Sequence, residues 1–200
     1  GAASPGWNLL GNPYTSAIDW DLLTKTASVD GSVYVLRASD GAYISWNGSA
    51  GDLTDGIIPA MQGYFVKATA ASQSVTMDAA DQVHASSTYY KSDNTEGTVV
   101  VSVAGEKGQS NAYIQFRDDA TKAFDHSIDA YKLFGYSAAP QVYTNDGENI
   151  YSINCLPYNI DNYNLPLAVK TDFVGEYTLT FSGIEDVSSN LVVKLKDLKL

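Results

Sequence analysis

Short runs of β-forming residues, separated by turn residues, make up most of the pattern of apolar and polar positions in this chain. Asn47-Gly48 and Asp55-Gly56 mark turns in the first half, and Asp40-Gly41 joins two runs in the manner of a hairpin. The strands expected here cover residues 33–36, 42–46, 64–68 and 75–77. Only residues 18–26 favour helix, as one short turn.

The second half shows the same pattern of short β-forming runs separated by turn residues. Residues 111–116 alternate apolar and polar positions, which predicts a strand with one buried face. Further strands are expected at 98–103, 141–144, 149–153, 165–171, 176–181 and 191–198. We therefore predict an all-β protein with an antiparallel β-sandwich or jelly-roll-like fold, made of two packed β subdomains with very little helix.

One polar connection divides the chain. Residues 84–97 are rich in serine, threonine, asparagine and aspartate, and they separate two β-rich halves. We place a soft boundary there, which gives a first domain at 1–85 and a second at 86–200. Whether the two halves share one core is left open by the sequence.

The stretch Gly6–Tyr14 reads as a strand that runs into a fixed turn, because Pro13 restricts its own backbone and that of Asn12. Alternation along the strand predicts that Trp7, Leu9 and Tyr14 face inward. The glycines of the stretch allow close approach of the backbone. We interpret the stretch as a packing element.

Two motifs in this order carry a resemblance to a known group of proteins. Gly-Trp-Asn-Leu-Leu-Gly-Asn-Pro-Tyr at 6–14 and Ile-Pro-Ala-Met-Gln-Gly-Tyr-Phe-Val-Lys-Ala at 58–68 are similar to a pattern in large secreted and cell-surface proteins of Bacteroidetes. Those proteins carry a type IX secretion sorting domain at their far end, which this chain lacks. Residues 120–133 and 151–154 resemble the segment that follows the pattern. The resemblance implies an extracellular or cell-surface location and a β-sandwich, and it implies no reaction.

Charge and composition limit the classes of partner that we expect for this chain. The chain has 200 residues, 12 lysines and arginines, and a net charge of −11. Nucleic acids and anionic membranes require clustered basic residues, so we expect neither as a partner. No apolar run reaches the ~18 residues of a membrane helix. The chain opens within a motif and ends on a stretch that alternates like a strand, so we expect an excised segment of a longer protein, with neighbouring domains as partners. The missing signal peptide therefore carries little weight.

Residues for catalysis are few. The two histidines, His84 and His126, have no nucleophile placed beside them in a known motif. Cys155 is the single cysteine, so it forms no intramolecular disulfide, and its apolar surroundings predict a buried thiol. No pair of acids stands out as a glycosidase pair. We therefore predict that the chain is not an enzyme.

A cluster of acids raises the question of a metal. Asp118, Asp119, Asp125 and Asp129 lie within twelve residues, in a stretch that reads as a loop and contains His126. Loop carboxylates are ligands for calcium, so a structural Ca²⁺ is one interpretation. The other interpretation is that Asp125 and Asp129 accept backbone N–H bonds in turns. The Asp-x-Asp-x-Asp-Gly spacing of a calcium-binding loop is missing. This absence favours the turn-forming role of these aspartates and a chain without a cofactor.

Aromatic residues in polar loops are the last candidate feature. Such side chains stack on sugars and anchor protein interfaces, and the alternative role is to pack at strand edges. The candidates for ligand binding are Tyr136, Tyr143, Tyr158, Tyr163 and Asn162.

We expect a non-catalytic segment of a bacterial cell-surface or secreted protein that acts in adhesion or in presenting other modules. Its partner would be a glycan or a host or bacterial surface protein. Two alternatives stay open: a carbohydrate-binding accessory module of a secreted glycan-degrading enzyme, and a structural spacer of a surface filament. Coplanar exposed aromatic rings would favour the first alternative, and unpaired strand edges at both chain ends would favour the second.

Overall fold

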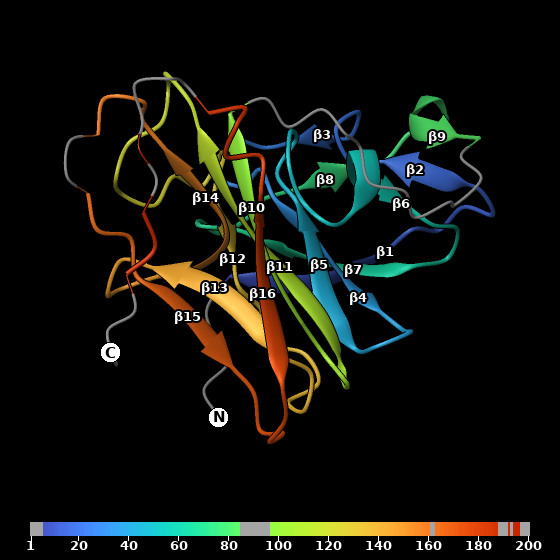
Figure 1. The fold of residues 1–200 in the computed structure, drawn as a ribbon. Coiled ribbons are helices and arrows are strands. Elements are labelled where there is room, and N and C mark those ends of the chain that lie inside the picture. The colour runs from blue at the N-terminus through green and yellow to red at the C-terminus, as the bar shows by residue number, and fades with distance from the viewer. Residues whose placement is uncertain (1–5, 85–96, 161–162, 188–191, 193, 197–200) are drawn as a thin grey trace.

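A computed structural model describes residues 6–84, 97–160, 163–187, 192 and 194–196 (Figure 1). In this part of the chain, helix is confined to two 3-10 turns, Thr54–Gly56 and Ala79–Asp81. The predicted all-β, sandwich-like fold is confirmed. None of the helices among these residues has the length and apolar character needed to cross a membrane.

The first half contains a four-stranded sheet flanked by two small ones. The four-stranded sheet has the order β1 (Trp7–Gly11), β7 (Gly63–Lys67), β4 (Val33–Arg37) and β5 (Ala42–Trp46). A three-stranded sheet has the order β6 (Ile57–Ile58), β2 (Ala17–Asp19) and β9 (Gln82–Val83). The remaining pair is β3 (Thr24–Lys25) with β8 (Val75–Thr76).

The second half forms one seven-stranded sheet. Its order is β15 (Leu167–Lys170), β13 (Gln141–Asn145), β14 (Ile150–Leu156), β11 (Gly108–Phe116), β10 (Thr98–Gly105) and β16 (Tyr177–Ser182), and β12 (Ala130–Tyr131) also pairs with β14. The neighbours β11 and β14 run parallel, which departs from the antiparallel expectation. The chain between them is long enough for the crossover that a parallel pair requires.

Three hydrophobic clusters hold these sheets together. The first cluster belongs to the first half and packs one face of the four-stranded sheet against β2 and β6; its largest buried side chain is Trp20. The third cluster belongs to the second half and joins three valines of β10 to Ala112, Val142 and Val187. The second cluster joins Tyr34 of β4 to Val100, Tyr113, Ile153 and other residues of the second half. The described core therefore crosses the boundary expected near residue 85.

Three local expectations differ from the structure. Residues 18–26 form β2, a turn and β3 instead of a helical turn, because Ile18, Trp20 and Leu23 all enter the first cluster. Leu9 is 64% exposed, and it is Leu10 that packs inward beside Tyr14. The described residues within the expected strand 191–198 lie in no strand, and the others lie outside the described residues.

Candidate functional site

A groove of about 770 Å³ lies beside β1, on the side of the four-stranded sheet that carries the first cluster. Alternation along β1 turns Gly6, Asn8 and Leu10 toward it. The far wall is the loop 69–74, which follows β7. The groove is thus built from an outer strand and the loop that continues from its neighbour.

The groove has an apolar floor and an uncharged polar rim. Leu10, Val29 and Val75 line it from the periphery of the first cluster. Hydrogen-bonding groups come from Asn8 and from a run of the far loop, namely Thr69, Ser72, Gln73 and Ser74. Sites for small or extended ligands combine these two surfaces, since the apolar part supplies affinity and the polar groups fix orientation.

Backbone hydrogen bonds fix the far wall in place. The Thr69 N–H donates to Ser28 O over 2.8 Å, and the Thr26 N–H donates to Ser74 O over 3.1 Å. Between these two ties, Ser72 has a φ of 61°, a left-handed conformation that is uncommon for a residue with a side chain. Such strain persists where the surrounding structure holds a loop in one shape.

One end of the groove carries its ionisable residues, Lys67 and His126. His126 Nδ1 lies 2.9 Å from the buried carboxylate oxygen Oδ1 of Asp30. The Lys67 ammonium lies 3.7 Å from the centroid of the Tyr131 ring and 5.9 Å from that of Trp7. Burial raises the pKa of Asp30, and the contact with His126 counteracts this rise. Lys67 and His126 thus line this end of the groove, and the Lys67 ammonium packs on aromatic rings that belong to the periphery of the second cluster.

The pair formed by His126 and Asp30 is the feature of the groove closest to catalytic chemistry. A buried carboxylate that orients an imidazole is part of a catalytic triad. None of the hydroxyl or thiol groups described in the structure is hydrogen-bonded to this imidazole. The neighbouring Ser127 instead donates its hydroxyl proton to Asp125 over 2.5 Å. The geometry thus assigns the pair a positioning contact between the two halves.

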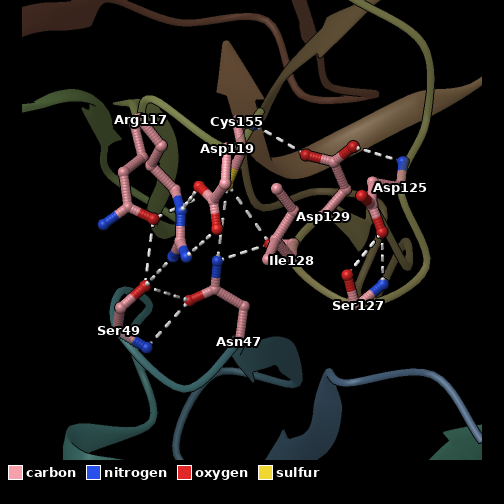
Figure 2. Close-up of polar contacts among 10 residues, drawn as sticks. Asn47, Ser49, Arg117, Asp119, Asp125, Ser127, Ile128, Asp129 and Cys155 are labelled. Carbon is pink, nitrogen blue, oxygen red and sulfur yellow. Dashed lines mark hydrogen bonds and ion pairs between the residues drawn. The ribbon is translucent and has the colours of Figure 1, made fainter. Parts of the chain in front are cut away.

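A polar network lies where the two halves meet (Figure 2). Asn47, which follows β5, donates from Nδ2 to Ile128 O over 2.5 Å. Its Oδ1 accepts the N–H groups of Ser49 and Ala50 over 3.0 and 2.8 Å. Ser49 in turn donates to Gln115 Oε1 of β11 over 3.0 Å. One short turn of the first half is therefore tied to both a loop and a strand of the second.

Asp129 is the buried carboxylate of this network. Its Oδ1 accepts the Cys155 N–H over 2.7 Å, and its Oδ2 accepts the Asp125 N–H over 2.8 Å. Burial raises the pKa of Asp129 to about 6, although both N–H donors favour the carboxylate. Asp129 thus closes the turn that positions His126.

The other candidate calcium ligands are engaged in separate contacts. Asp119 forms a two-pronged ion pair with Arg117, with distances of 2.8 and 2.9 Å. Asp125 Oδ1 accepts the Ser127 N–H over 2.8 Å, and Asp118 is exposed. No group of three or more metal-ligating side chains occurs among residues 6–84, 97–160 and the other described positions. The geometry therefore favours the turn-forming interpretation, and calcium binding gains no support from it.

Cys155 lies in the same network and is buried. Burial raises the pKa of its thiol far above its usual value, and the neighbouring Asp129 carboxylate adds to the rise. Its Sγ contacts Ile128 O over 3.3 Å. A thiol that stays protonated is a poor nucleophile, so the environment of Cys155 is that of a core residue.

The structure separates the predicted ligand-binding tyrosines. Tyr136 lines a second hollow of about 530 Å³ with Asp40 and Lys107, near the start of β11. Tyr143, on β13, packs edge-to-face on Phe134, with a centroid distance of 5.4 Å and an interplanar angle of 87°. The rings of Tyr143 and Phe134 therefore form no flat platform.

The remaining candidates lie elsewhere. Tyr158 stacks on Phe116 at the other end of β11, with a centroid distance of 6.1 Å. Tyr163 lies 5.2 Å from the Lys122 ammonium, measured from its ring centroid. Asn162 lies outside the described residues. The four tyrosines that the structure describes thus do not form one site.

The groove residues were missed because no single one has a distinctive motif. Asn8 lies within the stretch that we interpreted as a packing element, and Lys67 lies within the second motif of the resemblance. The polar loop that directly follows β7, Thr69 to Ser74, was a usable signal, since binding residues concentrate on loops held by a rigid sheet. His126 was considered only as a catalytic residue or a metal ligand.

Comparisons with known proteins give a family and no activity. No curated protein and no solved structure matches the chain. A family model described as "Domain of unknown function (DUF8693)" matches residues 2–200. Because this match covers nearly the whole chain, the protein belongs to the DUF8693 family.

Proposed function

We propose that this chain is a non-catalytic, adhesive segment of a secreted or cell-surface bacterial protein. The groove beside β1 carries the proposal. Its apolar floor and the amide groups of Asn8 and Gln73 on its rim are suited to holding a ligand without reacting with it. The extracellular location rests on the two sequence motifs at 6–14 and 58–68.

A spacer role is the second candidate function. β1 and β16 are outer strands of their sheets, and they are the first and last strands of the described chain. Outer strands offer backbone groups to a further chain. This arrangement suits a module that is joined to its neighbours through sheet edges.

Attachment of coated beads to surfaces tests the adhesive role. Beads carrying the protein would be applied to a glycan array and to immobilised surface proteins of bacterial and host cells. We expect attachment to a subset, reduced about tenfold in the double variant Asn8→Ala/Gln73→Ala. Tyr136→Ala, in the hollow at the start of β11, is the matched control and keeps attachment.

Two results would contradict the proposal in different ways. Absence of attachment to every surface, with a folded protein, would refute the adhesive role and favour the spacer. Loss of attachment with Tyr136→Ala and not with the groove variant would move the site to the loops near β11.

A further inference from the structure

The outer edge of β1 presents unpaired backbone groups. Ala68 N–H donates to Gly6 O over 2.8 Å, and Asn12 N–H donates to Gln62 O over 2.9 Å. Hydrogen-bonded positions alternate in an antiparallel pair, so residues 6, 8, 10 and 12 bond to β7. The N–H and C=O groups of Trp7, Leu9 and Gly11 therefore point away from the sheet.

Nothing in the described part of the chain covers this edge. No backbone or side-chain hydrogen bond to the main chain of Trp7, Leu9 or Gly11 is present there. The opposite edge of the same sheet is covered, since Leu53 N–H donates to Ser45 O over 3.2 Å and Tyr136 N–H donates to Gly41 O over 3.0 Å. In the described structure, the β1 edge of this sheet is thus open, whereas the β5 edge is covered.

β1 also lacks the usual protection of an outer strand. Natural sheets protect edges with lysine, proline, bulges or very short strands. β1 contains neither lysine nor proline, and its five residues pair with β7 in unbroken register, without a bulge. An unprotected edge of this length is a template for an added strand.

The shape and lining of the groove indicate which types of side chain an added strand would carry. An added strand would turn alternate side chains toward the same side as Asn8 and Leu10, where the groove lies. Its apolar floor and small far-wall residues, such as Ala70 and Ser72, suit apolar side chains of moderate size. Among the described residues that line it, Lys67 and His126 carry ionisable side chains, and both lie at the Gly6 end. In a chain of net charge −11, the Lys67 ammonium at this end is complementary to an acidic residue.

We propose that β1 binds an extended segment of a partner protein as an added strand, with alternate apolar side chains in the groove and an acidic residue beside Lys67 and His126. The inference rests on the adhesive role and names its ligand class as a peptide. Main-chain hydrogen bonds to Trp7, Leu9 and Gly11 supply the affinity. The groove and the Lys67 ammonium supply the specificity.

Leu9 offers a clean pair of variants. Leu9→Pro removes an N–H that points away from β7, so the β1–β7 hydrogen bonds remain. Leu9→Ala removes the same exposed side chain and keeps the N–H. The probe is a library of fluorescent eight-residue peptides that alternate apolar and polar residues, each ending in Asp, Asn or Lys, and binding is measured by anisotropy.

We expect Asp-ended peptides to bind about tenfold more tightly than their Lys-ended counterparts. Leu9→Pro should weaken binding about tenfold or more, and Leu9→Ala should change it by less than about threefold. Lys67→Gln should remove the preference for Asp over Asn. Circular dichroism verifies that each variant is folded.

Three outcomes would overturn the inference. One is that no peptide binds at millimolar concentration, which would leave attachment to glycans, and hence the adhesive role, untouched. The second is equal binding by Leu9→Pro and Leu9→Ala. The third is concentration-dependent self-association that Leu9→Pro abolishes, because the occupant would then be a second copy, paired through an edge such as that of β16.

Discussion

At the scale of single residues, the polar network shows buried charges used as connectors. Asp129 binds two backbone N–H groups from different segments. Lys132 is also buried and donates to Ser110 Oγ over 2.7 Å. Both groups are more costly to bury charged than neutral, so each leaves a signature in the pH dependence of stability.

Ionisation of Asp129 should lower the free energy of unfolding as the pH rises. Its pKa is raised to about 6 in the folded protein, so the folded state holds this proton more tightly than the unfolded state does. The stabilisation is complete below about pH 4 and is lost as the pH rises through about 6. Relative to Asp129→Asn, the wild-type free energy of unfolding should fall by up to about 3 kcal/mol over this range.

Urea denaturation between pH 4 and 7 measures this effect. Asp118→Asn, at an exposed position, is the control and should follow the wild-type curve. A constant difference between wild type and Asp129→Asn at every pH would show that Asp129 is not protonated preferentially in the folded state.

Lys132 should act in the opposite direction. Burial lowers its pKa to about 8, so the unfolded state binds its proton more tightly and wild-type stability rises with pH through about 8 to 10. We expect Lys132→Met to increase the free energy of unfolding by about 1–3 kcal/mol at pH 7, because it removes a buried charge.

This gain should shrink as the pH rises above about 8, which chemical denaturation at several pH values would reveal. Lys122→Met, at an exposed lysine, should show no such trend. A loss of stability in Lys132→Met would mean that the contact with Ser110 outweighs the cost of burial.

At the scale of elements, close backbone approach joins the first half to the loop before β12. Gly31 N–H donates to His126 O over 2.8 Å. A Cβ atom on Gly31 would lie 2.2 Å from Ser127 O. This position thus accepts only glycine, for reasons of space.

Gly31→Ala should therefore reduce the free energy of unfolding by about 1–3 kcal/mol, since one of two backbone segments must move. Thermal melting of this variant would be compared with Gly11→Ala, where an added Cβ meets no atom within 4 Å. Equal melting temperatures for the two variants would mean that the junction is looser than the structure indicates.

At the scale of the whole molecule, the second hydrophobic cluster makes the halves interdependent. Tyr34 is 1% exposed in this cluster, and its hydroxyl accepts the Tyr131 N–H over 2.8 Å. Separation of the halves would expose Tyr34, Tyr113 and Ile153 to water. The interface therefore resembles a core more than a contact between domains.

We expect the full chain to unfold in one transition, with coincident far-UV and near-UV circular dichroism curves. Fragments covering residues 6–84 and 97–200 should each fail to fold cooperatively on their own. Two separate transitions, or a cooperatively folded fragment, would instead establish two independent domains.

Much of the strand pattern could be predicted because its causes are local. The alternation at 111–116 and the run at 98–103 predicted β11 and β10, since a strand with one buried face must alternate. The two-residue strands β6 and β12 were not predicted. They are too short to have a periodicity, and their pairing depends on distant partners.

The candidate site was less predictable for the same reason. Side chains such as Asn8, Gln73 and His126 lie far apart in the sequence and meet only through the pairing of β1 with β7 and the position of the 124–129 loop. The aspartate cluster was visible in the sequence, but its partners were not. A hydrogen-bond donor from Cys155 cannot be assigned to Asp129 without the fold.

The sequence by itself determined the all-β class, most of the longer strands and the acidic character, because these follow from composition and from periodicity within single segments. Only the tertiary structure decided that the halves share a core, that β1 is an outer strand beside a groove, and that Leu9 faces water. These features depend on which strands become neighbours, and strand pairing is set by contacts between residues that are distant in the chain.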